Sequence, residues 1–161
     1  MEPGGVVIDE WQLSDFENGI YHLQVYGPNG FFNEFKGDQH DPLGVEVACE
    51  YETDLKRRDL LTGNILLRLG NTLLSTKDAG PRLVEFEIVD NAYKTPTQKI
   101  TLPANKQIIK YQYVPINTAK SFGWYDFTVK IKGNSVFERR YAGRVENGEP
   151  GKTDPFMGRM V

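Results

Sequence analysis

The sequence predicts an all-β protein, an antiparallel β-sandwich of about nine strands that is immunoglobulin-like in size. Apolar and polar residues alternate with a period of two through most of the 161-residue chain. Turn residues separate these stretches at intervals of about 10 to 15 residues, as in sandwiches. There is no β-α-β alternation and no Gly-rich phosphate loop, which argues against the common nucleotide-binding folds.

Six stretches carry the alternation, each with its apolar residues on one strand face. In chain order these apolar sets are Tyr21, Leu23 and Val25; Val45, Val47, Cys49 and Tyr51; Ile65, Leu67 and Leu69; Val84, Phe86 and Ile88; Ile109, Tyr111 and Tyr113; and Tyr125, Phe127, Val129 and Ile131. Turns are expected at Pro28-Asn29-Gly30, Ala79-Gly80-Pro81, Thr95-Pro96 and Gly133-Asn134. Residues 54–61 read equally as a turn or two of helix or as a charged loop.

The composition indicates one ordered domain. Hydrophobic residues make up 39% of the chain and charged residues 25%, too apolar for a disordered segment. We place the domain at residues 16–158, after a lead-in at 1–15 and before a short end at 159–161. No stretch approaches the ~18 apolar residues of a membrane span, and the first five residues lack the features of a secretory signal.

Charge is distributed unevenly along the chain. Residues 1–54 hold 12 acidic residues and one basic residue, whereas residues 55–161 hold 10 acidic and 18 basic residues. A sheet that interleaves the two halves would neutralise this asymmetry, and segregated halves would create an acidic face. Neither arrangement gives the basic stripe with aromatic residues that nucleic-acid binding requires.

The single cysteine, Cys49, excludes an internal disulfide and a cysteine-based zinc site. Because it alternates with apolar residues, we predict a buried structural thiol rather than a reactive one. No cofactor is expected.

One hairpin pattern occurs twice. Residues 18–38 and 122–148 each contain a Gly, an aromatic-led strand, a turn with Asn and a second strand that carries Phe and ends on Gly, at a spacing of 104 to 106 residues. The chain thus holds about one and a half repeat units. We predict that the first hairpin pairs into the sandwich and covers an otherwise exposed strand edge.

Three motifs resemble the C-terminal repeat domains of bacterial phosphocholine-preferring phospholipases C. They are Gly-Pro-Asn-Gly-Phe at 27–31, Gly-Trp-Tyr-Asp at 123–126 and Phe-Glu-Arg-Arg-Tyr-Ala-Gly-Arg-Val-Glu-Asn-Gly at 137–148. The ending Thr153-Asp154-Pro155 is similar to the signature that closes those domains, with Thr in place of the usual Ser. The first hairpin departs from the pattern, since Glu34 stands where an Arg usually precedes the Phe, and residues 53–61 match nothing in it.

The resemblance implies a context rather than an activity. In that family an N-terminal domain of alkaline-phosphatase-like fold carries out phosphoric diester hydrolysis, and this chain contains no such domain. The expectation is a non-catalytic accessory domain of a secreted bacterial hydrolase of lipid catabolism, extracellular or periplasmic, that packs on the catalytic domain and aids lipid presentation. The alternative is a stand-alone module that binds carbohydrate or a membrane surface through exposed aromatic residues.

Candidate binding residues follow from side-chain chemistry. Trp124 offers an amphipathic surface for lipid or sugar, or it packs under the terminal segment. The guanidinium groups of Arg139, Arg140 and Arg144 suit a phosphate headgroup, although pairing with a local acid such as Asp126 or Glu146 is the alternative.

Metal and catalytic signals are weak. Asp38, His40 and Asp41 could hold a divalent ion or could simply form an acidic turn. His22, on the polar face of its strand, is expected to be solvated. No nucleophile stands next to a base, and there is no paired-carboxylate motif.

Overall fold

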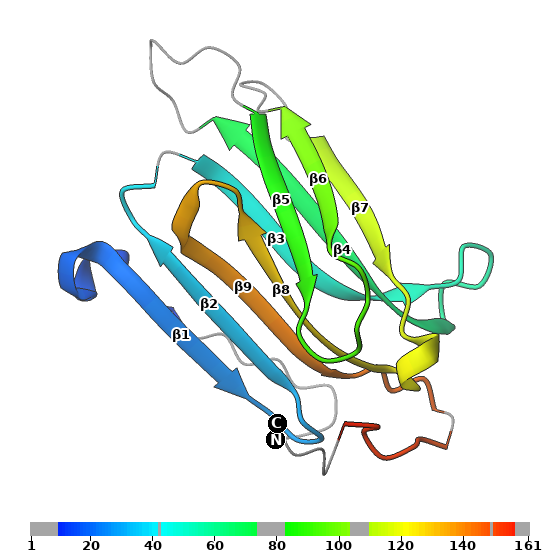
Figure 1. Ribbon diagram of the computed structural model, residues 1–161. Coiled ribbons are helices and arrows are strands. Elements are labelled where there is room, and N and C mark those ends of the chain that lie inside the picture. Colours follow the sequence, from blue (N-terminus) through cyan, green and yellow to red (C-terminus); the bar gives the residue numbers. More distant parts are fainter. Residues whose placement is uncertain (1–9, 42, 74–82, 104–109, 149, 157–161) are drawn as a thin grey trace.

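The computed structural model describes residues 10–41, 43–73, 83–103, 110–148 and 150–156. In this part of the chain nine strands form two antiparallel sheets, which confirms the predicted sandwich (Figure 1). The larger sheet has the order β1-β2-β9-β8-β5-β6, and the smaller has the order β3-β4-β7. The strands are β1 (Ile20–Tyr26), β2 (Phe32–Asp38), β3 (Leu43–Thr53), β4 (Leu61–Leu73), β5 (Leu83–Asp90), β6 (Gln98–Pro103), β7 (Lys110–Ile116), β8 (Trp124–Ile131) and β9 (Asn134–Arg144).

Helical structure is limited to three single 3-10 turns in the described residues, η1 (Leu13–Asp15), η2 (Glu17–Gly19) and η3 (Ala119–Ser121). None of them is long and apolar enough to cross a membrane. Residues 54–60 form a loop rather than a helix, because the Asp54 carboxylate accepts hydrogen bonds from the backbone amides of Lys56 and Arg57 and closes a turn.

The core lies between the two sheets, and three of the predicted apolar faces, those of β4, β5 and β8, form most of it, whereas the predicted β1 set lies outside the buried cluster and its Val25 is exposed. On β4, Ile65, Leu67 and Leu69 are fully buried. The β5 set and the β8 set face them from the larger sheet and are also buried. Each such side chain contributes about 1.5–3 kcal/mol of hydrophobic stabilisation, so this face dominates the folding free energy.

Strand β7 has the opposite phase from the one predicted. Val114 and Ile116 are its buried residues, whereas Tyr113 is half exposed, and Ile109 lies outside the described residues. Tyr111 lies on the outer face, where its hydroxyl donates to Glu46 over 2.8 Å and the Arg68 guanidinium covers its ring. Both residue sets of this strand are apolar enough for the core, and the polar partners of the tyrosine decide between them.

The two similar hairpins lie side by side in the larger sheet (Figure 1). Strand β2 pairs with β9 antiparallel, so the first hairpin extends the sheet at β9 as predicted. Each hairpin places a tyrosine directly opposite a glycine, Tyr21 opposite Gly37 and Tyr125 opposite Gly143. In each, the tyrosine ring occupies the space above the glycine backbone that a larger residue would fill.

The pairing of β2 with β9 also interleaves the acidic and basic parts of the chain. Glu34 lies opposite Arg140 in the ladder, and Lys36 lies opposite Glu138. The Lys36 ammonium is 2.9 Å from the Glu138 carboxylate. At Glu34 and Arg140 the acidic part of the chain thus meets the basic part within the sheet.

Gly143 combines an unusual backbone conformation with close packing against a buried tyrosine. Its φ is 155°, and an added Cβ would lie 2.9 Å from the hydroxyl of buried Tyr125. Gly143→Ala should lower the free energy of unfolding by about 2 kcal/mol or more, through backbone strain plus overpacking. Gly133→Ala is the matched control, because its φ is 80° with no atom within 4 Å, and strain alone costs about 1 kcal/mol. Equal losses in urea unfolding would contradict the role of the tyrosine.

Deletion of residues 1–38 removes β1 and β2 and exposes the edge of β9. We expect an aggregating or unfolded product, because the exposed edge presents unpaired backbone groups. Size-exclusion chromatography and thermal melting measure this outcome. A soluble fragment with unchanged cooperative melting would show that the hairpin is an appendage.

Candidate functional site

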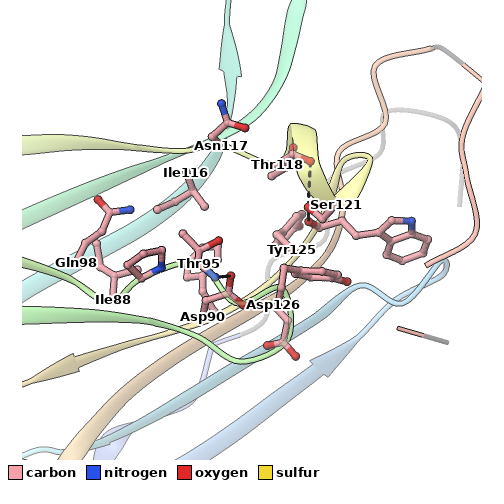
Figure 2. Close-up of a pocket in the computed structure, with 14 residues that line it drawn as sticks. Ile88, Asp90, Thr95, Gln98, Ile116, Asn117, Thr118, Ser121, Tyr125 and Asp126 are labelled. Atoms are coloured by element: carbon pink, nitrogen blue, oxygen red, sulfur yellow. Dashed lines mark hydrogen bonds between the residues drawn. The ribbon is translucent and has the colours of Figure 1, made fainter. Parts of the chain in front are cut away.

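A narrow pocket opens where β5 ends and β8 begins (Figure 2). Its empty volume is about 380 Å³, and apolar core residues such as Ile88 and Phe127 form part of its wall. Figure 2 shows polar groups at its rim, with Asp90 bonded to Thr95 and Thr118 bonded to Ser121. An apolar wall with polar groups at the rim is typical of ligand-binding pockets, which makes this pocket a candidate site.

Asp90 organises the loop beside this pocket. Its carboxylate accepts hydrogen bonds from the backbone amides of Ala92, Tyr93 and Thr95, at 2.7 to 2.9 Å. Burial alone would raise the pKa of Asp90, but the hydrogen bonds from Thr95, Tyr93 and Ala92 bring that pKa below its usual value. A carboxylate that is held in this way closes a turn and is poorly suited to act as a general base.

Ser121 is the serine that lines this pocket. Its Oγ lies within hydrogen-bond distance of two backbone carbonyls, those of Thr118 and Trp124, and donates its single proton between them. The two histidines of the chain, His22 and His40, are on β1 and just after β2, at the other end of the sheet order. The pocket therefore brings no nucleophile to a base.

The C-terminal segment covers the same end of the sheet. The Trp124 indole donates to the carbonyl of Lys152 over 2.8 Å, so this tryptophan is partly buried under that segment. Asp154 accepts from the Tyr93 hydroxyl over 3.2 Å, and the Phe156 ring packs edge-on against the Tyr93 ring. Asp154, part of the closing signature, thus anchors the segment. A ligand-binding role for Trp124 stays a prediction.

Arg140 pairs with Asp126 on the outer face of the larger sheet. Two parallel hydrogen bonds of 2.9 and 2.7 Å join the guanidinium to the carboxylate. The pairing that the sequence suggested for one of the arginines is therefore confirmed. Because a bidentate pair uses most of the guanidinium's donors on one side, a phosphate would have to compete with Asp126 at this position.

Arg139 points to the opposite face of the sheet, towards the first hairpin. Its guanidinium donates to the Tyr21 hydroxyl over 2.6 Å and to the backbone carbonyl of Lys36. It also lies over the Phe137 ring, 4.4 Å from the centroid, with Phe35 nearby. These contacts tie β9 to both strands of the hairpin, which is a structural role.

Arg144 differs from the other two arginines. Its Nε is buried and has no hydrogen-bond partner in the described part of the chain. The residue ends β9 and lines two neighbouring hollows of the surface. Of the three predicted arginines, it alone keeps an unused buried donor.

The predicted metal residues are engaged in turn contacts. The Asp38 carboxylate accepts from the backbone amide of His40 over 2.8 Å, and the Asn134 side chain donates to Asp41. His40 contacts its neighbour Gln39. Within the described residues no three His, Cys, Asp or Glu side chains gather in a way that could hold a metal ion.

Cys49 is mostly covered and packs against the core. Burial raises the pKa of its thiol to about 12, and neighbouring Glu50 adds to this effect. The thiol is therefore protonated at neutral pH, in keeping with the predicted structural role.

Glu34 is a buried acidic residue that the sequence did not single out. It lies on the outer face of β2, only 6% exposed, and accepts from Gln24 over 2.9 Å. His22 is 2.6 Å away, so this histidine has a partner that the sequence did not indicate. These contacts of Glu34 could be predicted only from the register of the first hairpin, which sets Gln24 opposite Glu34.

Most of this chain matches one protein family. Residues 1–38 and 45–144 match the family described as bacterial phospholipase C, C-terminal domain. The chain is 32% identical over 149 residues to a non-hemolytic phospholipase C of Pseudomonas aeruginosa, covering 88% of this chain and 19% of that protein. It is 35% identical over 150 residues to a non-hemolytic phospholipase C of Burkholderia pseudomallei, and the match covers 92% of this chain and 19% of that protein.

A hemolytic phospholipase C of Pseudomonas aeruginosa is 30% identical over 146 residues, which cover 87% of this chain and 17% of that protein. This chain belongs to the family of bacterial phospholipase C C-terminal domains. It spans about a fifth of the length of these relatives.

Glu34 should make stability depend on pH. Burial alone would raise its pKa, but hydrogen bonds from Gln24, His22 and Lys36 lower the pKa from 4.5 to about 2. A depressed carboxylate pKa stabilises the fold above about pH 4.5, and this contribution is lost as the pH falls towards 2. Glu34→Gln should therefore lower the free energy of unfolding at pH 7 by about 1–3 kcal/mol, with a gap that closes below pH 4.5.

Urea unfolding at pH 7, 4 and 2.5 measures this gap. Glu50→Gln is the control, because Glu50 is half exposed and 3.6 Å from Arg68, and such a pair contributes at most about 1 kcal/mol. A gap for Glu34→Gln that stays constant with pH would mean that its charge is not the cause.

Proposed function

We propose that this chain is a non-catalytic accessory domain of a bacterial phospholipase C, which packs on the catalytic part of its parent polypeptide and helps to present lipid to it. The observation that carries the proposal is the family match over nearly the whole chain, together with its small share of each relative. Such a parent is a hydrolase, and we place it outside the cytoplasm, in the periplasm or beyond.

The side-chain chemistry supports a non-catalytic role. The hydroxyl of Ser121 is bonded to backbone carbonyls, Arg140 is held by Asp126, and Asp90 closes a turn. Each of these groups is held by a partner of its own, and they do not converge on a space where a substrate atom could react.

The edge at β1 supports packing on another body. β1 pairs with β2 on one side, and no described strand pairs with its other side. Large apolar side chains are exposed on β1 and on the segment before it, with Tyr26 73% and Ile20 52% exposed. Trp11 and Leu13 add to them. Exposed apolar residues beside an open strand edge are characteristic of an interaction surface.

Two measurements test the proposal. The purified chain should not hydrolyse a chromogenic phosphocholine ester above background, and turnover would overturn the non-catalytic role. In the full-length parent, Ile20→Lys should lower the melting temperature by several degrees, because it places a charge in the docking edge. Leu55→Lys is the matched control, since Leu55 is 95% exposed in the β3–β4 loop. Equal effects of both variants would contradict docking at β1.

A further inference from the structure

Strand β1 differs in its residues from the three other strands that lie at a sheet edge. Edges are usually blunted by charged side chains, by proline or by a bulge, because a bare edge invites pairing with another strand. The other three follow this rule: β3 carries Glu46, Glu50 and Glu52, β6 carries Lys99 and Pro103, and β7 carries Pro115. Strand β1 contains no Lys, Arg, Asp, Glu or Pro, and it pairs with β2 without a bulge. Its edge is therefore open to a partner strand.

The backbone groups of β1 point alternately towards β2 and away from it, as in any antiparallel pair. Beside the hairpin turn, the Gly27 amide donates to the Phe31 carbonyl over 2.9 Å. Because the register continues from there without a shift, the odd-numbered residues of β1 bond to β2. The amides and carbonyls of His22 and Gln24 face the other way, where no described strand pairs with β1.

The second hairpin shows what a strand of this kind carries on the same edge. The shared tyrosine–glycine pairs make β8 equivalent to β1, with Tyr125 in the place of Tyr21 and Asp126 in the place of His22. The Asp126 carbonyl accepts a hydrogen bond of 2.9 Å from the amide of Asn91, directly after β5. Strand β8 thus uses for β5 the backbone positions that β1 leaves open.

Burial of the inward-facing side chains shows the same difference between the two strands. In β8, Phe127 is 3% and Val129 0% exposed, and Ile88 of β5 lies opposite Val129. The equivalent residues of β1 are Leu23, which is half-buried, and Val25, which is 44% exposed. Strand β1 therefore has the apolar face of a central strand, but within the described residues it lacks the neighbour that buries this face in β8.

The family match indicates where such a neighbour comes from. It falls into two stretches, 1–38 and 45–144, and each ends with one of the two hairpins. The second stretch includes β4 to β7 ahead of its hairpin, whereas the described part of the first holds two 3-10 turns and the hairpin. The matched family is a C-terminal domain, and this chain covers only 17 to 19% of its relatives, so most of their remaining length precedes it.

We propose that β1 receives one more antiparallel strand from the parent polypeptide, a strand equivalent to β5 from the part of the parent that precedes the first hairpin. This strand bonds to the backbone groups of His22 and Gln24, and its apolar face covers Leu23 and Val25. The inference rests on the proposed packing role and names the element that makes the contact.

Amide hydrogen exchange, resolved by residue, tests the pairing in the chain and in its full-length parent. In the chain alone, the amides of Leu23 and Val25 should exchange slowly and those of His22 and Gln24 rapidly, because only the first two bond to β2. In the parent, His22 and Gln24 should exchange at least about tenfold more slowly than in the chain. Unchanged exchange at these two residues would overturn the added strand, as would slow exchange at all four in the chain alone.

The same parent separates this inference from the accessory role. Rapid exchange at His22 and Gln24, together with a lowered melting temperature of the Ile20→Lys parent, would mean that β1 docks through side chains alone. That result would keep the accessory role and overturn the added strand. Hydrolysis of the phosphocholine ester by the chain would overturn the non-catalytic role and leave the exchange result unaffected.

Gln24→Pro removes an amide that faces the added strand, since proline has no N–H. Gln24→Ala is the matched control, because both variants lose the side-chain hydrogen bond to Glu34. The two should melt within about 2 °C of each other in the isolated chain, whereas in the parent Gln24→Pro should melt several degrees lower. Equal melting in the parent would contradict the pairing. If Gln24→Pro does not fold, the exchange measurement decides, because it needs no variant.

A second copy of the protein is the competing occupant of this edge. Analytical ultracentrifugation of the parent distinguishes the two, and we expect Gln24→Pro to leave its association state unchanged because the added strand belongs to the same polypeptide. A parent dimer that Gln24→Pro dissociates and Gln24→Ala does not would assign the edge to a second copy and overturn the proposal.

Discussion

The pairing of β2 with β9 is the contact on which the rest of the structure depends. It joins the first hairpin to the second and thereby makes a six-stranded sheet from two smaller pieces. Arg139 reinforces it from within, because one guanidinium on β9 bonds to the Lys36 carbonyl on β2 and to the Tyr21 hydroxyl on β1. A single side chain thus spans three neighbouring strands, and hydrogen bonds to a charged donor are stronger than neutral ones.

This pairing gives the two faces of the sheet different chemistry. On the outer face, Glu34 comes next to the arginine that holds Asp126, so the acidic start of the chain meets its basic end. On the inner face, Phe35 contacts Tyr141, and the aromatic residues of the two hairpins form one continuous layer. Charge therefore fixes the register on one side, while ring packing fixes it on the other.

The buried face of a strand could be predicted from the sequence where only one of its two faces is apolar. The alternation from Tyr125 to Ile131 could be read directly, because its opposite face carries Asp126 and Lys130 and cannot enter the core. On β7 both faces are apolar, so period alone could not decide the phase. The hydrogen bond from Tyr111 to Glu46 decides it, and that partner is on another strand.

The sites were harder to predict, because they are assembled across strands. The motif around Arg139, Arg140 and Arg144 was recognisable, yet the strand pleat sends neighbouring side chains to opposite faces and gives each arginine a different partner. Glu34 and His22 become neighbours only through the hairpin register. The groove lined by Phe31, Tyr51, Tyr125 and Tyr141 draws on several elements, and no local sequence pattern predicts it.

The place of that groove between the two sheets has a consequence for the dynamics of the domain. Phe31 and Asn33 come from the first hairpin, Tyr51 and Cys49 from the smaller sheet, and Tyr125 and Tyr141 from the second hairpin. This groove exists only while the three parts are together, so its aromatic rings become exposed to solvent when the first hairpin separates from the rest. Since β2 pairs with β9, the rate at which the amide hydrogens of β2 exchange with solvent would report how often that separation occurs.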